Sequence, residues 1–316
     1  MSIFKAIAFS AGGLFLVVFF AGQLLRGLSG TAIHFKTPAF LLSVIFLGFD
    51  PENLGVGAIG SYESFSGIAT GSIIGAAMVA MALALGISAL FAPLKFKNVP
   101  KRIMLIPFLS VLLFTILILD KYLSRYDGII LIAGYCISII YLIQLNRKGY
   151  NIKAGGEISE SLEKKNLPGR WKSAGLMIIS LAAIIGGSEM LVKGSGTILQ
   201  ELNLSGTVYG MTILALLVSS EEIARELPAA LKGKSDITIG NVIGSVIAFF
   251  LFNAGVIALV SPVDIPDKVI EFFLPASIIT ILFIITVMLF TRGVPRWAGA
   301  LLVIFYLAFA ITGYFL

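Results

Sequence analysis

The chain has 316 residues, of which 58% are hydrophobic and only 13% are charged, with a formal net charge of +6. A soluble protein carries roughly twice that charged fraction, so the composition excludes an ordinary soluble domain and favours an integral membrane protein. The single cysteine and single histidine argue against a zinc or transition-metal centre of the usual ligand type. The basic residues are spread over several loops, which argues against nucleic-acid binding.

Hydrophobic runs long enough to cross a bilayer, at roughly 20 residues per helix, recur along the whole chain. We therefore predict an all-α integral membrane protein with ten transmembrane helices. The predicted spans are residues 6–27, 39–63, 68–92, 103–119, 127–146, 174–198, 207–231, 237–260, 269–291 and 296–315.

Lysine and arginine are distributed unevenly among the predicted loops. If the N-terminus is outside, the inner loops carry sixteen basic residues and the outer side carries four. Basic loops remain cytoplasmic, so this asymmetry predicts a multi-pass protein of the cell membrane with both termini outside. The one long polar segment, 147–172, is expected to be a cytoplasmic linker with a short helix at 158–165. It separates a first half at 1–146 from a second half at 173–316, and five spans per half make the second half inverted relative to the first.

A weak internal repeat relates the two halves at one constant offset in residue number. Identical residues align without a gap: Gly71, Ile74, Gly75, Gly86, Ala89, Leu90 and Pro93 lie on Gly240, Ile243, Gly244, Gly255, Ala258, Leu259 and Pro262. Just upstream, the stretch 50–53 lies on 219–222. Paired hydrophobic segments that are broken by acidic and glycine residues at matching places indicate a transporter site near the bilayer midplane.

Acidic residues lie inside the predicted second and seventh spans. The two polar stretches contain Asp50, Glu52 and Asn53, and Ser219, Glu221 and Glu222. An ionised carboxylate at the bilayer centre costs at least ~2.5–3.5 kcal/mol, so idle acids are not expected there. Pro51 breaks the backbone ladder and frees carbonyl oxygens. Such oxygens are the ligands that Ca²⁺, Mg²⁺ or Na⁺ prefer. The alternative is that these acids lie at a helix end close to water.

Two glycine-containing motifs follow the acidic stretches, at 71–76 and 240–245. Glycines four residues apart let another helix approach closely, and this alone explains the motif structurally. Each motif, however, follows its acidic stretch at the same spacing, because the step from Asn53 to Ser72 equals the step from Glu222 to Asn241. This spacing predicts that Ser72, on one side, and Asn241 with Ser245, on the other, face the acids.

Arg225 lies three residues after Glu222 and one before Glu226, so these residues share roughly one helical face. It either neutralises a carboxylate or snorkels to the cytoplasmic end of the span near Lys232. We favour the second interpretation.

Other polar residues in the spans receive structural interpretations. Glu189 and Lys193 form a predicted i,i+4 pair, and Glu63 is expected to be solvated near the outer end of its span. His34 is interpreted as a solvated or capping residue near a helix end. Cys136 stands alone in a span and cannot form an intrachain disulfide.

On these motifs the chain resembles the cation/Ca²⁺ exchanger superfamily, and within it the prokaryotic sodium/calcium exchangers. Members have two inverted five-helix halves. Each half carries a Gly-Thr-Ser-Leu-Pro-Glu element and, at the same spacing after its Glu as in this chain, a Gly-Asn-x-x-Gly-Ser element. Residues 240–245 match the second element fully, and Glu222 stands at the position of the metal-binding Glu. The resemblance implies outward Ca²⁺ movement against Na⁺ or H⁺ by alternating access.

This chain departs from the family pattern mainly in its first half. Asn53 stands where the family has its other Glu, and Glu52 and Glu221 occupy the Pro positions. Oxygen ligands are also replaced at further positions, by Ser72, Ala76, Ala80 and Phe249. The resemblance therefore implies that Asp50 or Glu52 supplies the missing charge. With fewer sodium ligands, coupling to three sodium ions is in doubt and proton coupling stays open.

We predict a secondary antiporter that exchanges a divalent cation, expected to be Ca²⁺, for Na⁺ or H⁺. The alternatives are a transporter of the same fold for Mg²⁺, Mn²⁺ or a monovalent ion, and a non-transporting membrane scaffold. An enzyme is not expected, since no nucleophile–base pair or cofactor motif is present. Glu222 is predicted to be the central ligand. The full set of predicted cation-site residues is Asp50, Glu52, Asn53, Ser72, Ser219, Glu221, Glu222, Asn241 and Ser245. The expected partners are inorganic cations and the lipid bilayer, no organic cofactor is expected, and we expect a monomer.

Overall fold

The computed structural model describes residues 2–34, 50–95, 101–147 and 169–315. The first part of the predicted second span and the predicted linker helix at 158–165 lie outside these residues. Within them the protein is helical apart from four two-residue strands, and η denotes π-helical segments. The elements before the linker are α1 (Ile3–His34), α3 (Pro51–Tyr62), α4 (Ser66–Thr70), η1 (Gly71–Gly75), α5 (Ala76–Met78), η2 (Val79–Ala84), α6 (Leu85–Phe91), β1 (Leu94–Lys95), α7 (Lys101–Leu117), β2 (Tyr122–Leu123) and α8 (Arg125–Arg147).

The part of the chain after the linker begins with a long helix and then has a broken one. Its elements are α10 (Arg170–Glu201), α11 (Gly206–Tyr209), η3 (Gly210–Leu214), α12 (Ala215–Val218), α13 (Ser220–Leu231), α14 (Ser235–Ile247), η4 (Ala248–Asn253), α15 (Ala254–Val260), β3 (Val263–Asp264), η5 (Val269–Phe273), α16 (Leu274–Thr291), β4 (Gly293–Val294) and α17 (Arg296–Phe315).

Many of the helices have the length and composition of membrane spans. Among the described residues, seven helical segments are long and apolar enough to cross a bilayer. The pair Gly206–Val218 and Ser220–Leu231, bent by 49°, makes an eighth if it is one broken span. Ile103–Leu117 is a shorter apolar helix. The chain is therefore an all-helical, multi-pass membrane protein, whereas the prediction of ten spans includes residues that the structure does not describe.

Several elements of the two halves recur at the same offset in residue number as the sequence repeat, which aligns Gly71 with Gly240. The helix α3 and the helix α13 have matching bounds, as do the later π-helical, helical and strand segments: η2 with η4, α6 with α15, and β1 with β3. The turns after α3 and α13 also match, because Ser64 (φ 62°) and Gly233 (φ 68°) both adopt the left-handed conformation that ends a helix. The sequence repeat therefore corresponds to a structural one.

The four short strands form two antiparallel ribbons, each joining the two parts of the chain. Strand β1 pairs with β4, with Leu94 opposite Val294, and β2 pairs with β3, with Leu123 opposite Val263. Beside the second ribbon, Lys121 forms an exposed 2.6 Å ion pair with Asp267, and this hydrogen bond raises the pKa of Lys121. Exposed pairs of this kind contribute little stability. The ribbons thus tie the two parts together at loops outside the spans.

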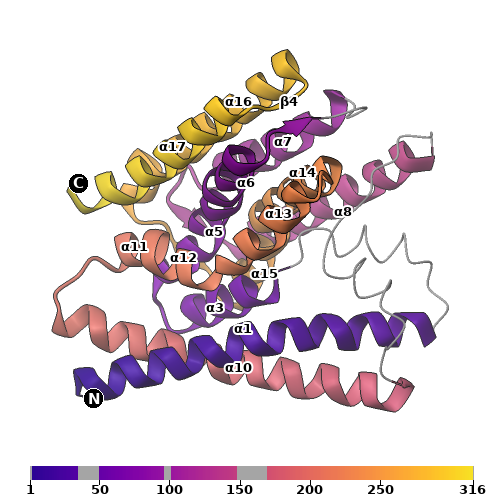
Figure 1. The fold of residues 1–316 in the computed structure, drawn as a ribbon. Helices are drawn as coiled ribbons and strands as arrows, with labels where there is room; N and C mark the ends of the chain where they lie inside the picture. The colour runs from indigo at the N-terminus through magenta and orange to yellow at the C-terminus, as the bar shows by residue number, and fades with distance from the viewer. Residues whose placement is uncertain (1, 35–49, 96–100, 148–168, 316) are drawn as a thin grey trace.

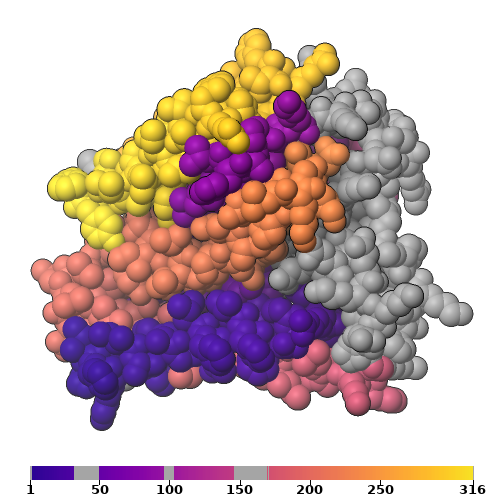
Figure 2. Space-filling view, in the orientation of Figure 1, coloured from indigo at the N-terminus to yellow at the C-terminus, as the bar shows by residue number. Residues whose placement is uncertain are grey.

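The helices are arranged around two central, deeply buried spans. The segments Ser66–Phe91 and Ser235–Val260 are 83% and 78% buried, against 22–44% for the other spans. The helices α1 and α10 pack along each other at one margin, and α16 with α17 lies at the opposite margin (Figure 1). In the space-filling view, the orange segment around α13 and α14 reaches the surface between these margins (Figure 2). The buried centre is where the broken helices meet.

Close backbone contact between η1 and η3 brings the two broken regions together. A Cβ atom added to Gly71 would collide with the backbone of Gly210, and one added to Gly67 would meet the backbone of Gly206 at 2.5 Å. Only glycine permits this approach. The first of the two glycine motifs predicted to allow close packing therefore does so at Gly71.

Candidate cation site

The helix α3 begins inside the protein, with an N-cap residue and a proline in its first turn. The Asp50 carboxylate accepts hydrogen bonds from the backbone N–H and from Nδ2 of Asn53, both at 2.8 Å, and Pro51 occupies the first turn. Asp50, Glu52 and Asn53 are each at most 1% exposed. These acids do not lie in water at a helix end, so the structure rejects that alternative.

The broken helix of the second half meets the start of α3 at Ser219. This residue ends α12 with a backbone conformation outside the helical region (φ −92°, ψ 14°), and α13 starts at the next residue. Its hydroxyl accepts a 2.8 Å hydrogen bond from Nδ2 of Asn53. Asn53 thus joins the start of α3 to the break before α13. The N-terminal ends of two half-helices, which favour nearby negative charge, point into one site.

Three carboxylates come together at this junction. Oxygen atoms of Asp50, Glu52 and Glu221 all lie within 4.8 Å of one another. Glu52 is 1% exposed, and no donor among the described residues hydrogen-bonds to either of its oxygens. Burying an ionised carboxylate costs several kcal/mol unless it is paired. This cluster therefore requires a bound cation or protons, and its donors are the hard oxygens that Ca²⁺, Mg²⁺ or Na⁺ prefer.

Glu222 lies beside this cluster and already has partners. Its side chain is fully buried and accepts hydrogen bonds from Nδ2 of Asn241 and from Oγ of Ser245, both at 3.1 Å. The predicted contact of Asn241 and Ser245 with an acid is therefore present. The role of Glu222 as the central ligand stays a prediction, and the three-carboxylate cluster is the alternative centre.

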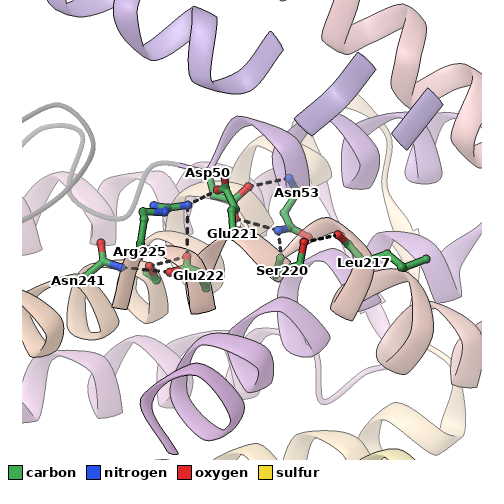
Figure 3. A network of polar contacts seen from close by, with 10 residues as sticks. Asp50, Asn53, Leu217, Ser220, Glu221, Glu222, Arg225 and Asn241 are labelled. Carbon is green, nitrogen blue, oxygen red and sulfur yellow. Dashed lines mark hydrogen bonds and ion pairs between the residues drawn. The ribbon is translucent and has the colours of Figure 1, made fainter. Parts of the chain in front are cut away.

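Arg225 does not snorkel to the cytoplasmic end, so the interpretation we favoured from the sequence is wrong. Its guanidinium hydrogen-bonds to Glu221, and the same nitrogen lies 3.8 Å from the Glu222 carboxylate; its side chain is 14% exposed (Figure 3). Local acids stabilise the positive charge where it stands, so it has no need to reach water. Helical periodicity placed Arg225 on the right face but gave no depth.

The remaining predicted residues fall in and around the site as follows. Ser72 is buried in η1, beside Gly57, which lies one turn beyond Asn53 in α3. Glu226, on the turn after Glu222, is a further buried acid at 1% exposure that was not included in the predicted set, although its position one turn from Glu222 was a signal for it. Glu63, expected to be solvated, lies 3.5 Å from Lys193.

One interpretation from the sequence is confirmed near these residues. Lys193 pairs with Glu189 at 2.5 Å, as the i,i+4 spacing predicted, and the pair lies outside the carboxylate cluster. Helix α1 ends at His34, and the solvated or capping role of this residue stays a prediction.

Burial differs among the side chains of the site. Glu221 and Arg225 have side chains that are 17% and 14% exposed, whereas Asp50, Glu52 and Glu222 are almost fully buried.

Comparison with known proteins identifies the family. The family described as sodium/calcium exchanger protein matches residues 5–144 and 172–315, which together cover most of the chain. The chain belongs to this family. It is thereby a member of the cation/Ca²⁺ exchanger superfamily, a family of membrane antiporters and calcium transporters and not of enzymes.

Individual relatives and a solved structure agree with this assignment. The sodium/calcium exchanger MaX1 of Methanosarcina acetivorans is 24% identical over 308 residues, which cover 87% of this chain and 88% of that protein. A Ca²⁺/H⁺ antiporter of Synechocystis is 24% identical over 213 residues, which cover 61% and 55%. A structure of the sodium-calcium exchanger NCX_Mj soaked with Na⁺ and Sr²⁺ superposes with a TM-score of 0.62 at 25% identity, over 98% of this chain and 99% of that one.

Proposed function

We propose that this protein exchanges Ca²⁺ for Na⁺ or H⁺ across the cell membrane, with the cation bound where α3 and α13 begin. The observation that carries the proposal is the cluster of Asp50, Glu52 and Glu221, in which Glu52 is buried without a hydrogen-bond donor. Asn53, Ser72, Ser219, Glu222, Asn241 and Ser245 complete the wall of the site.

The charge balance of the site favours a divalent cation. Five acids lie in or next to it (Asp50, Glu52, Glu221, Glu222 and Glu226), and Arg225 is the one basic side chain that the described residues place among them. A monovalent ion leaves more of this negative charge uncompensated in a low-dielectric setting than Ca²⁺ does. Ca²⁺ also tolerates the irregular coordination that carboxylates from two helices offer, whereas Mg²⁺ requires near-ideal octahedral geometry.

Alternating access requires that the site open to each side in turn. The chain bends by 49° at Ser219 in one half of the site, and α3 begins at a buried N-cap, Asp50, in the other half. Such half-helices at a repeat interface are a common basis for the movement of one part of a transporter against the other. We propose that halves 1–146 and 173–316 are inverted relative to each other, in a monomer with both termini outside.

The residues of the site are compatible with either Na⁺ or H⁺ as the counter-ion. Ala76, Ala80 and Phe249 are buried and offer no side-chain oxygen, so few sodium ligands are available besides the carboxylates and Ser219. Carboxylates that bind a metal also bind protons. The two relatives differ in the same respect, since one is named a sodium/calcium exchanger and the other a Ca²⁺/H⁺ antiporter.

Ion flux in proteoliposomes tests this function. The purified protein is reconstituted with a Na⁺ gradient alone, with a pH gradient alone and with neither, and uptake of Ca²⁺, Mg²⁺, Mn²⁺ and K⁺ is followed. We expect gradient-driven Ca²⁺ uptake that exceeds uptake of the other ions. Preference for another ion would assign the altered selectivity instead, and absence of any flux would support the non-transporting scaffold.

A further inference from the structure

Arg225 occupies an unusual place for a basic residue in a cation transporter. One nitrogen of its guanidinium, Nη2, hydrogen-bonds to Oε1 of Glu221 and lies 3.8 Å from Oε1 of Glu222 (Figure 3). Glu221 is a member of the three-carboxylate cluster, and Glu222 is not. The arginine therefore stands between one carboxylate that faces the cation and one that is held outside the cluster.

Because Arg225 pairs with Glu221, its positive charge must compete with any cation that binds to Glu221. Two unit charges at about 4 Å repel appreciably even at an effective dielectric constant of 20, and a divalent ion doubles the effect. Arg225 is permanently charged, so it cannot withdraw by losing a proton. The bound ion and Arg225 therefore cannot share Glu221 without a large loss of affinity.

We propose that Arg225 is a tethered counter-cation: it pairs with Glu221 while the cluster holds no metal ion, and it passes to Glu222 when a divalent cation binds. The proposal rests on the cation binding of the proposed function. In the ion-free state Arg225 supplies a positive charge that compensates the buried carboxylates of the site.

The surroundings of Glu222 suit it to receive the arginine. Asn241 and Ser245 each donate one hydrogen bond to a different oxygen of its carboxylate, which fixes its orientation toward Arg225. Each carboxylate oxygen has a second lone pair to offer. The transfer requires only that the guanidinium close a gap of 3.8 Å, because the two acids are neighbours in the first turn of α13. Glu52 accepts no hydrogen bond from the described residues, so its carboxylate remains available to the metal ion.

Direct Ca²⁺ binding to the purified full-length protein in detergent tests this proposal without transport. In Arg225→Gln the competing charge is absent, and we expect the Kd for Ca²⁺ to fall about tenfold or more. In Glu222→Gln the arginine loses the charged carboxylate to which it would pass, and we expect the Kd to rise about tenfold. In the double variant the affinity should return to at least the wild-type value. Arg296→Gln removes an exposed arginine at the start of α17 and should leave the Kd unchanged.

The outcomes separate this inference from the function on which it rests. If Glu222 is itself a metal ligand, the double variant will bind Ca²⁺ clearly more weakly than Arg225→Gln, although neither variant has an arginine to transfer, and the inference fails. If wild type binds Ca²⁺ and Arg225→Gln has the same Kd, the inference also fails while the proposed function stands. If neither wild type nor any variant binds Ca²⁺, both fail. Should Arg225→Gln not fold, structures of the wild type with and without Ca²⁺ decide, since Arg225 must contact Glu222 in the first and Glu221 in the second.

Discussion

Glu52 shows at the scale of one residue how function opposes stability in this site. Its carboxylate is 1% exposed and lacks a hydrogen-bond donor among the described residues, while Asp50 and Glu221 lie close to it. Such a group is costly to bury unless a cation is bound. We therefore interpret the free-energy cost of burying Glu52 as a consequence of its role in cation binding.

Replacing Glu52 with Gln is expected to stabilise the ion-free protein and to abolish Ca²⁺ uptake. The amide removes one buried negative charge and gives a donor to the neighbouring carboxylates. In chains of about 150–250 residues, a gain of about 1 kcal/mol in the free energy of unfolding raises the Tm by about 2–4 °C. Melting temperatures without Ca²⁺, together with uptake in proteoliposomes, check this. The matched control is Glu201→Gln, at the exposed end of α10. A lower Tm with normal uptake would contradict the role given to Glu52.

Replacing Ser219 with Ala removes the acceptor that joins the start of α3 to the break before α13. Asn53 then loses one of its two side-chain hydrogen bonds. A buried donor left without a partner costs about 1–3 kcal/mol. We expect a lower Tm in the absence of Ca²⁺. Ser220→Ala should change the Tm less, because the Ser220 hydroxyl donates to the Leu217 carbonyl at the exposed side of the break. Equal effects of the two variants would argue against a stabilising link at Ser219.

At the residue scale, the sequence predicted which positions are polar and buried but not how they pair. Asn241 and Ser245 were expected to face an acid, and both bond to Glu222. The pairing of Arg225 with an acid was one of two interpretations and was not the favoured one, because helical periodicity gives a face and no depth in the membrane. The grouping of Asp50, Glu52 and Glu221 depends on the relative rotation of α3 and α13, which the repeat does not specify.

At the scale of elements, the repeat predicted more than its few identical residues suggest. Its constant offset extends to the bounds of whole helices, as α3 and α13 show. It extends also to the π-helical segments η2 and η4, whose conformation no sequence pattern announced. The pairing of β1 with β4 and of β2 with β3 was not predicted either, because two-residue strands carry no periodicity.

Close packing of η1 on η3 predicts a contrast between two glycine substitutions. A Cβ at Gly71 would collide with the Gly210 backbone, while Gly186 in α10 has no atom within 4 Å of such a Cβ. We expect Gly71→Ala to destabilise the protein by about 1–3 kcal/mol through overpacking. Gly186→Ala should be neutral or stabilising by up to about 1 kcal/mol, since alanine favours the helix. Melting temperatures in detergent measure both, and equal shifts would show that the contact does not constrain the fold.

At the scale of the whole molecule, the proposed orientation predicts which loops face the cytoplasm. In a Cys136→Ser background, single cysteines are placed at Lys232, expected inside, and at Lys268, expected outside. A membrane-impermeant maleimide added to intact cells should label only position 268, and both positions after lysis. Labelling of position 232 in intact cells would reverse the proposed orientation.

Transport as a whole is predicted to depend on pH. Metal binding requires deprotonated carboxylates, so protons compete with Ca²⁺ for Asp50, Glu52 and Glu221, and Ca²⁺ uptake should fall as the pH is lowered. Uptake is measured with a sodium gradient alone and with a pH gradient alone. Full activity on a sodium gradient, with no response of uptake to pH between about 6 and 8, would contradict the prediction.

The central claim is that Asp50, Glu52 and Glu221 together bind the transported cation. An experimental structure of the protein soaked with Sr²⁺, an analogue of Ca²⁺ with usable anomalous scattering, tests it most directly. We expect one anomalous peak at about 2.3–2.6 Å or slightly more from oxygens of these three carboxylates. A peak held by Glu222, Asn241 and Ser245 instead, or no peak in this region, would contradict the claim.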